Sequence, residues 1–210
     1  MFDNLKIISK KLNANFRITT YIPKDYDKND IIYKAVYILC GTNPYQNPNY
    51  HLEEILDNKN AIGIAIYPNL DIAKNKMLYN TFEDKPGFAK LYEDFIINEI
   101  KPIINQKYRV NPNALNNVII GINDTAILAY SLAHHYTNQF DKVLMYNLNT
   151  DSYHKLFMSD FKSKFDPNIS FFYSMDNNKN SLEIESILTM FGSKDFKLLN
   201  KNITSLLELI

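Results

Sequence analysis

The fold of this chain is decided by the stretch Val118-Ile-Ile-Gly-Ile-Asn-Asp-Thr-Ala126, which a helix-forming run follows to about Phe140. Its first five residues are apolar and predict a strand buried on both faces of a sheet. Polar residues follow at once, and Asp124 or Thr125 can cap the next helix. The stretch therefore predicts a strand, a sharp turn at Asn123 and a helix.

On both sides of this stretch, apolar runs alternate with helical patterns. Such alternation predicts an α/β fold with a mainly parallel central sheet and helices on both faces. The first two strands predict an antiparallel hairpin at the N-terminal edge of the sheet. We predict strands at residues 5–12, 15–23, 33–40, 61–67, 118–122, 142–147, 169–174 and 196–199. We predict a helix at residues 51–57 and a second one from 88, with a kink or an end of its regular part at Pro102. A third helix follows the cap at Asp124 or Thr125 and runs to about Phe140, and two more are predicted at 181–191 and 203–210.

Length, charge and cysteine content narrow the functional class. The 210 residues contain no linker or repeat, so we expect one domain over residues 1–210. Because 23 basic and 23 acidic residues balance, a broad nucleic-acid surface is not expected. Cys40 is the only cysteine, which suits a reducing compartment. With no signal-peptide pattern at Met1 and no apolar run of membrane-spanning length, we expect a cytoplasmic protein without membrane contacts.

Several segments in order carry a resemblance to a known family. The residues 121–125, Gly-Ile-Asn-Asp-Thr, occupy the place of the G-x-S-x-G nucleophile elbow of α/β-hydrolases. Together the segments resemble the putative esterase family of α/β-hydrolases, with its esterase D-like and enterochelin esterase-like members. The other segments are Phe16-Arg-Ile-Thr-Thr-Tyr-Ile-Pro-Lys-Asp-Tyr26, the run 33–41 with Cys40 where the family has Asp, FIINEIKPIINQKYRV at 95–110, and His135-Tyr-Thr-Asn-Gln-Phe140.

The resemblance implies an α/β-hydrolase fold and a Ser–His–acid triad, which this sequence does not supply in full. Asn123 stands at the serine position, and a carboxamide is no nucleophile at ordinary pH. No histidine follows His154, although the family places its catalytic histidine near the C-terminus. The acid is expected at Asp176, which fits an ordinary turn equally well. Thr125 replaces the second glycine and suggests a relaxed elbow, or simply a helix start capped by Asn or Asp.

Parts of the site can persist without the triad. The backbone amide of Asp124, with the loop that begins at Gly41 and Thr42, would form the oxyanion hole that the resemblance implies. Together with Asn123, these residues are our predicted ligand-binding set. Cys40, at the end of a buried strand, is the alternative nucleophile, although buried cysteines are usually inert. The sequence shows no metal-ligand spacing and no glycine-rich phosphate loop, so neither a metal nor a cofactor is expected.

The leading hypothesis is an esterase-fold protein without serine-esterase activity. It would act by binding a small molecule or ester in the strand-end pocket, or a protein partner. The alternative is an active carboxylester or thioester hydrolase, in which Cys40 or a displaced serine attacks with help from His51 or His154. A third reading is a structural subunit that forms a homo-oligomer through a sheet edge. The tyrosines at positions 45, 50, 67 and 79 fall at predicted loops or strand ends and are candidates to line the pocket.

Overall fold

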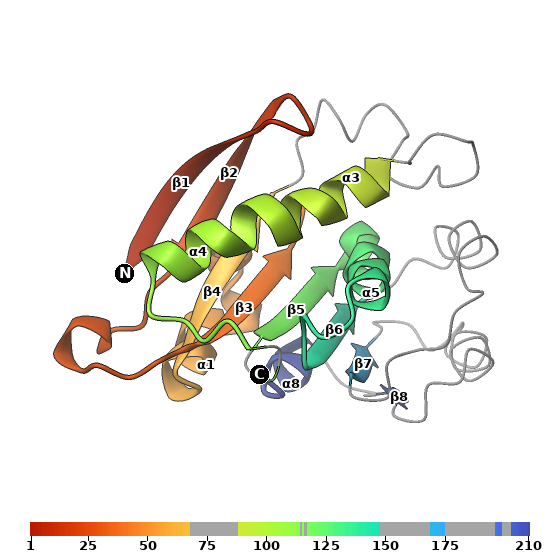
Figure 1. The fold of residues 1–210 in the computed structure, drawn as a ribbon. Helices are drawn as coiled ribbons and strands as arrows, with labels where there is room; N and C mark the ends of the chain where they lie inside the picture. The colour runs from red at the N-terminus through yellow and green to blue at the C-terminus, as the bar shows by residue number, and fades with distance from the viewer. Residues whose placement is uncertain (68–87, 114, 116, 148–168, 175–195, 199–202) are drawn as a thin grey trace.

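One mixed sheet of eight strands organises the molecule (Figure 1), and its strand order is β1-β2-β4-β3-β5-β6-β7-β8. The computed structural model describes residues 1–67, 88–113, 115, 117–147, 169–174, 196–198 and 203–210. Strands β1 and β2 are antiparallel to each other, and β2 is antiparallel to β4. All pairs from β4 through β8 are parallel. The predicted α/β-hydrolase-like sheet with an antiparallel N-terminal edge is therefore confirmed.

The strands agree with the sequence prediction except at the hairpin. The first strand was predicted at 5–12 but begins and ends three residues earlier. It ends at Ser9 because Ser9 Oγ accepts a hydrogen bond from the Leu12 backbone N–H and Asn13 adopts a positive φ of 47°, which together turn the chain. The strands are β1 Phe2–Ser9, β2 Ala14–Tyr21, β3 Lys34–Leu39, β4 Ala61–Ile66, β5 Asn117–Ile122, β6 Lys142–Tyr146, β7 Ser170–Ser174 and β8 Phe196–Leu198.

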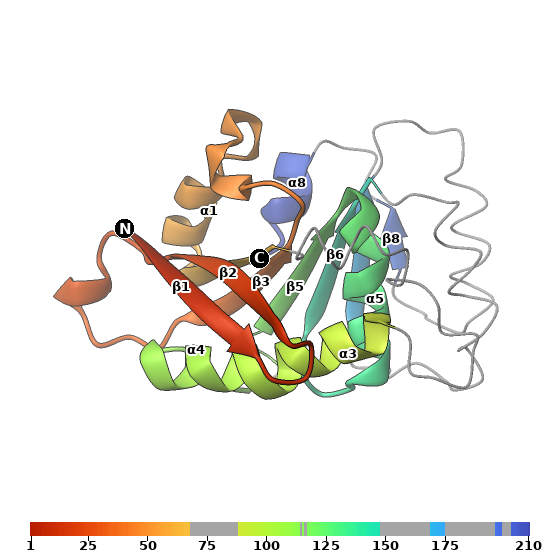
Figure 2. The ribbon, with the colours of Figure 1, turned by 90° about the horizontal axis from the view of Figure 1, so that it is seen from above.

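Helices cover both faces of the sheet (Figure 2). One face carries α3 (Phe88–Phe95), a π-helical segment η5 (Ile96–Ile100), α4 (Lys101–Lys107) and α5 (Ala126–His135). The other face carries α1 (Leu52–Asn58) and α8 (Ile203–Leu207). The predicted helix at 181–191 lies outside the described residues. None of the described helices has the length and apolar character that crossing a bilayer requires.

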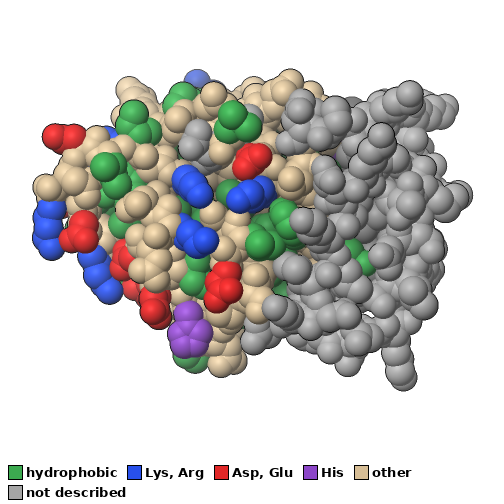
Figure 3. Space-filling view, turned by 90° about the horizontal axis from the view of Figure 1, so that it is seen from below, with side chains coloured by type: hydrophobic (Ala, Val, Ile, Leu, Met, Phe, Trp, Pro, Cys, Tyr) green, Lys and Arg blue, Asp and Glu red, His purple; other side chains and the backbone are tan. Residues whose placement is uncertain are grey.

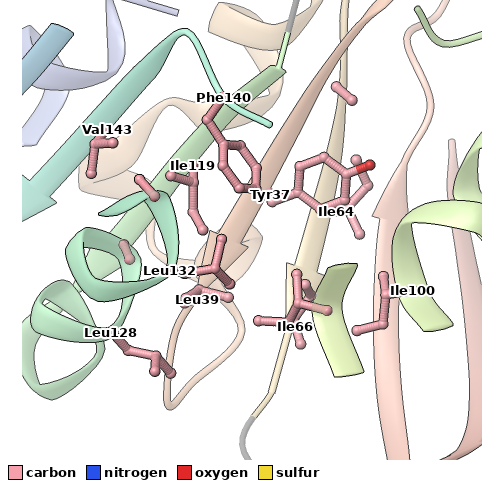
Figure 4. Packing of buried hydrophobic residues seen from close by; sticks show 14 of the residues in the cluster. Tyr37, Leu39, Ile64, Ile66, Ile100, Ile119, Leu128, Leu132, Phe140 and Val143 are labelled. Carbon is pink, nitrogen blue, oxygen red and sulfur yellow. The ribbon is translucent and has the colours of Figure 1, made fainter. Parts of the chain in front are cut away.

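Alternate residues of the central strands face the two helical layers. In β3, Tyr37 and Leu39 belong to the core under α5, while Val36 and Ile38 belong to the core under α1 and α8. All four are buried, as expected for a parallel strand covered on both faces. The ring of Phe140 meets Tyr37 edge-on, with their centroids 5.9 Å apart (Figure 4). Both cores thus consist of buried apolar side chains from alternate strand positions, and this alternation fixes the sheet register.

Pro102 neither ends nor sharply interrupts the helix that contains it. The chain stays helical from α3 to α4, but the five residues before α4 form the π-helical segment η5. Pro102 lacks the N–H that a regular helix would use four residues back, and a local change of hydrogen-bond spacing accommodates this loss. Of the two predicted outcomes, a kink or an end of the regular part, the structure shows the second, since the regular α-helix gives way to η5 before Pro102.

The helix α5 is tied to α3 by a buried polar cluster. Glu93 is fully buried, and Ser131 Oγ donates a hydrogen bond of 2.6 Å to its Oε1 atom. His135 Nδ1 lies 2.7 Å from Glu93 Oε2 and 3.4 Å from Ser131 Oγ. Ser131 is itself buried and directs its proton to the carboxylate, so this cluster has a structural role. Its carboxylate is compensated by two partners, as a buried charge requires.

The same helix ends earlier than its sequence predicts. Its last residue is His135, whereas the prediction extended it to about Phe140. Tyr136 leaves the helical region, with φ −118° and ψ 68°, and the positive φ of Asn138, 62°, keeps a right-handed helix from resuming. Phe140 then turns inward to the core, where 1% of its surface is exposed. An apolar residue at position 140 therefore serves this core contact and does not indicate that the helix continues.

A buried lysine joins α4 to the chain that follows α5. Only 5% of Lys101 is exposed, and its Nζ donates to the backbone oxygen of Gln139 at 3.2 Å. The ammonium also lies 4.9 Å from the ring centroid of Phe140 and 5.2 Å from that of Tyr37. No carboxylate among its described neighbours compensates the charge, and burial lowers the pKa of Lys101 to about 8.

We expect this lysine to make stability rise with pH above neutrality. Between pH 8 and about 10.4, the unfolded chain holds the Lys101 proton and the folded chain does not. The unfolded state then binds more protons, so the free energy of unfolding rises with pH, by on the order of 2 kcal/mol from pH 7.5 to 9.5. Urea unfolding of the wild type and Lys101→Met at both pH values measures this as a growing difference in favour of the wild type.

Lys6→Met, at an exposed position of β1, is the matched control. Its difference from the wild type should be the same at both pH values. A difference for Lys101→Met that is equally constant would contradict the prediction.

Three lysines, two on the sheet and one at the end of α1, bind backbone carbonyls just after α8. Lysine and arginine side chains gather near the middle of the face in Figure 3, with acidic side chains close by. Backbone carbonyls at the C-terminal end of a helix attract cations, because they have no partners within the helix. The Nζ atoms of Lys34, Lys59 and Lys142 donate to Ile210 O at 3.0 Å, Glu208 O at 2.7 Å and Leu209 O at 2.9 Å, respectively.

Candidate functional site

The turn after β5 has the backbone geometry of a strained strand-to-helix elbow. The strand ends at Ile122, one 3₁₀ turn spans Asn123–Thr125, and α5 begins at Ala126. Asn123 has a φ of 56°, in the left-handed region that disfavours most side chains. Asparagine is among the few residues that tolerate it. The side chain at the apex is therefore presented at the C-terminal end of the strand, as an elbow requires.

Gly121 is required by the close approach of the helix to the strand. A Cβ atom built on Gly121 would lie 2.4 Å from the backbone oxygen of Thr125 and 2.5 Å from the Cα of Ala126. Both are backbone atoms and cannot move aside like a flexible side chain. The first glycine of the elbow pattern is thus kept for a steric reason.

Thr125 tightens the elbow, so the expectation of a relaxed elbow was wrong. Its Oγ1 accepts a hydrogen bond from the Ile122 N–H at 3.0 Å. The same hydroxyl lies 2.5 Å from Leu39 O and 2.9 Å from Ile122 O, so it can donate to the end of β3. Thr125 occupies the N-cap position of α5, yet its side chain makes no capping bond to the helix. Instead of the predicted cap, the Thr125 side chain makes hydrogen bonds that join the ends of β5 and β3.

A second asparagine lies beside the elbow. Strands β5 and β6 are parallel, with Ile122 opposite Tyr146, so the residues after them are neighbours. Asn147 also has a positive φ, of 52°, and its Nδ2 donates to Asn123 Oδ1 at 2.8 Å. This bond occupies the acceptor of Asn123 and leaves its Nδ2 donor without a bond to any described residue. The two strand ends together fix the orientation of the Asn123 carboxamide.

A cavity of about 620 Å³ opens at this edge of the sheet, and Asn123 lines it. Its described walls come from the turns before α1, the ends of β5 and β6, and the start of α8. The other lining residues are two asparagines, two tyrosines, a histidine, an isoleucine and a threonine: Asn47, Asn49, Tyr50, Tyr146, His51, Ile203 and Thr204. The Thr204 hydroxyl donates to Asn49 O at 2.9 Å and joins two of these walls. The cavity size suits a small molecule.

The predicted oxyanion-hole residues lie outside the described lining of this cavity. Gly41 and Thr42 are exposed directly after β3 and Cys40, and Asp124 is exposed next to Asn123. Their role in binding an anion or carbonyl therefore stays a prediction. The acid candidate Asp176 and His154 lie outside the described residues.

Cys40 is buried in the core under α1 and α8. Only 2% of it is exposed, and its Sγ lies 3.8 Å from Ile38 O. Burial raises the pKa of the Cys40 thiol to about 12, so almost no thiolate exists at neutral pH. In the described part of the chain, its hydrogen bond goes to a backbone carbonyl and to no histidine. His51 instead lines the cavity together with Asn123.

Most of the cavity residues were missed by sequence reasoning. Asparagine is so frequent in this chain that Asn47, Asn49 and Asn147 gave no signal individually. A usable signal exists at Asn147, because it follows β6 as Asn123 follows β5, and parallel neighbours end at the same edge. Of the four candidate tyrosines, Tyr50 lines this cavity and Tyr45 lines a smaller one beside it. Among the described residues, no three His, Cys, Asp or Glu side chains gather to hold a metal ion.

Comparison with known proteins assigns the whole chain to a family. The family model described as Putative esterase matches residues 9–208, which is nearly the whole chain. The chain belongs to this esterase family. No curated protein sequence matches it.

Solved structures of esterases share the fold. A ferulic acid esterase is 19% identical, covers 96% of this chain and 90% of its own, and superposes with a TM-score of 0.71. An IroE-like serine hydrolase from Shewanella oneidensis is 18% identical, with 100% and 77% covered and a TM-score of 0.73. An S-formylglutathione hydrolase from Agrobacterium tumefaciens is 13% identical, with 99% and 92% covered and a TM-score of 0.69. At these identities the likeness shows the fold alone.

The apex of the turn after β5 carries a carboxamide, that of Asn123. A hydroxyl at the apex can attack a carbonyl once a base removes its proton. The carboxamide of Asn123 can only donate and accept hydrogen bonds. The described geometry therefore supports orientation of a bound molecule, and Asn123 offers no nucleophile for an ester.

Proposed function

We propose that this esterase-family protein lacks serine-esterase activity and binds a small molecule in the cavity at the strand ends. The observation that carries the proposal is the placement of Asn123. It occupies the elbow apex at a positive φ, lines the cavity, and is oriented by Asn147. The backbone strain of the elbow is retained while the nucleophile is gone. Strain that persists in this way favours a continuing use of the site.

The missing base supports the same proposal. The sequence holds no histidine after His154, so the C-terminal position that the resemblance assigns to the base has none. From the described C-terminal part of the chain, the start of α8 brings Ile203 and Thr204 to the cavity. A serine restored at position 123 would therefore lack the activation that a triad provides.

A hydrolase that uses Cys40 is the second candidate, and the geometry gives it little support. Attack on an ester requires a thiolate and access to the substrate. Burial raises the pKa of the Cys40 thiol to about 12, and the side chain is almost completely enclosed. His51 is exposed at the cavity, but no hydrogen bond joins it to Cys40.

Turnover of p-nitrophenyl acetate and butyrate tests the proposal. We expect the wild type, Asn123→Ala, Asn123→Ser and Cys40→Ala all to remain at the rate of the buffer, because none joins a nucleophile to a base. A family member with an intact serine elbow is the positive control. A clear wild-type rate that Cys40→Ala abolishes would identify a thiol hydrolase. A rate that only Asn123→Ala removes would show that the elbow itself catalyses the reaction.

A further inference from the structure

The cavity at the elbow is lined by neutral polar groups, and this restricts what it can hold. We infer that it takes an uncharged polyhydroxylated ligand, a sugar or a sugar-like molecule. This inference rests on the proposed binding function and names its ligand class. Four features carry it: the charge of the walls, the free amide donors, the tyrosine rings and the position of the nearest carboxylates.

The described lining contains no Lys, Arg, Asp or Glu side chain. An anion taken from water into a partly enclosed site needs a cation or a helix N-terminus, and a cation needs carboxylates. His51 is the one histidine in the described lining. A ligand without formal charge avoids the desolvation cost that these walls leave uncompensated.

In two asparagines at the cavity, the side-chain oxygen accepts a hydrogen bond and the NH₂ group donates none to a described residue. Asn123 Oδ1 accepts from Asn147 Nδ2 at 2.8 Å, and Asn47 Oδ1 accepts from the Asn49 N–H at 3.1 Å. The Nδ2 groups of Asn123 and Asn47 donate to no described residue. Each NH₂ group is held by the bond that its own oxygen makes. Such fixed donors match ligand oxygens, and a hydroxyl group can accept from them while it donates elsewhere.

Aromatic rings supply the apolar part of the wall. Tyr50 and Tyr146 are partly buried, line the cavity and pack against the core under α1 and α8. The C–H face of a sugar ring is apolar and can cover a tyrosine ring while its hydroxyls reach polar groups at the side. Ile203 is the one aliphatic side chain in the described lining. A wholly apolar ligand would therefore leave the carboxamides without partners.

Of the two sets of described lining residues, the one with carboxylates belongs to a neighbouring cavity. A smaller cavity of about 230 Å³ lies next to the first and shares Asn47 and His51 with it. Glu53 and Glu54 line this second cavity. A cationic ligand is thus the strongest rival, because part of it could extend toward these carboxylates. The experiment must compare neutral and cationic sugars directly.

Titration of the protein followed by NMR of the asparagine side-chain amides tests the inference. The neutral probes are methyl glucoside and maltose, and glucosamine and glucuronate are their cationic and anionic counterparts. We expect saturable shifts of the Asn47 and Asn123 side-chain NH₂ signals with a neutral probe, and weaker or no binding of both charged sugars. Asn123→Ala should weaken the binding about fivefold through the lost hydrogen bond. Asn58→Ala, an exposed asparagine on α1, should leave it unchanged.

Two results would overturn the inference. One is tighter binding of glucosamine or glucuronate than of methyl glucoside, which would mean that the ligand is charged. The other is the absence of saturable shifts with both neutral probes up to about 0.1 M, a concentration that detects even very weak binding. Neither result touches the proposed loss of esterase activity, which the p-nitrophenyl ester assay measures separately.

Discussion

Gly121→Ala is expected to lower the free energy of unfolding by about 3 kcal/mol. The added methyl group would lie 2.4 Å from Thr125 O and 2.5 Å from the Cα of Ala126, and both atoms belong to the backbone. Relief requires α5 to move away from β5, and that movement strains the buried packing around the helix. Equilibrium unfolding in urea, followed by circular dichroism, measures the change.

Gly41→Ala is the matched control, because no atom lies within 4 Å of a Cβ built at that position. We expect its free energy of unfolding to stay close to the wild-type value. If Gly121→Ala proved as stable as Gly41→Ala, the elbow would not be packed as tightly as the structure indicates.

Glu93→Ala is expected to cost about 3 to 5 kcal/mol of stability. The carboxylate is fully buried and binds Ser131 Oγ and His135 Nδ1 at 2.6 and 2.7 Å. Alanine leaves a cavity and removes the partner of both groups, and Ser131 is too deeply buried to find water instead. The same urea titration measures this loss.

Two further variants separate the causes. Glu93→Gln keeps the shape and one acceptor oxygen for Ser131, so we expect a smaller loss, of about 1 to 2 kcal/mol. Glu54→Ala removes an exposed carboxylate of α1 and should change stability little. If Glu93→Ala and Glu54→Ala lowered the free energy of unfolding equally, the buried cluster would not stabilise the packing of α3 against α5.

The central strands could be predicted from the sequence because their signal is local. A parallel strand covered on both faces must be apolar throughout, and the predicted runs at 33–40, 61–67 and 118–122 match β3, β4 and β5 within a residue at each end. The opening hairpin was shifted because its strands carry mixed residues. There the turn chemistry of Ser9 and Asn13 decides the ends, and it depends on side-chain hydrogen bonds that a pattern does not reveal.

The elbow could be located from the sequence, but its tightness could not. The first glycine and the strand-to-helix pattern indicated the turn, and Asn123 has the positive φ that an elbow apex requires. Thr125 was misread because its hydroxyl bonds to Leu39 in a different strand. Such a partner is 86 residues away along the chain. The cavity shares this property, since its described walls come from four separate parts of the sequence.

The lysine contacts at the end of α8 join segments that lie far apart in the sequence. Lys34 and its carbonyl partner are 176 residues apart, and Lys59 and its partner are 149 apart. A nascent chain emerges from the N-terminus, so the hairpin and the first parallel strands can form early. Contacts of such separation form late, because their loops must close first. Ile203 and Thr204 lie in this late-docking segment, so the cavity is assembled only after α8 has packed against the sheet.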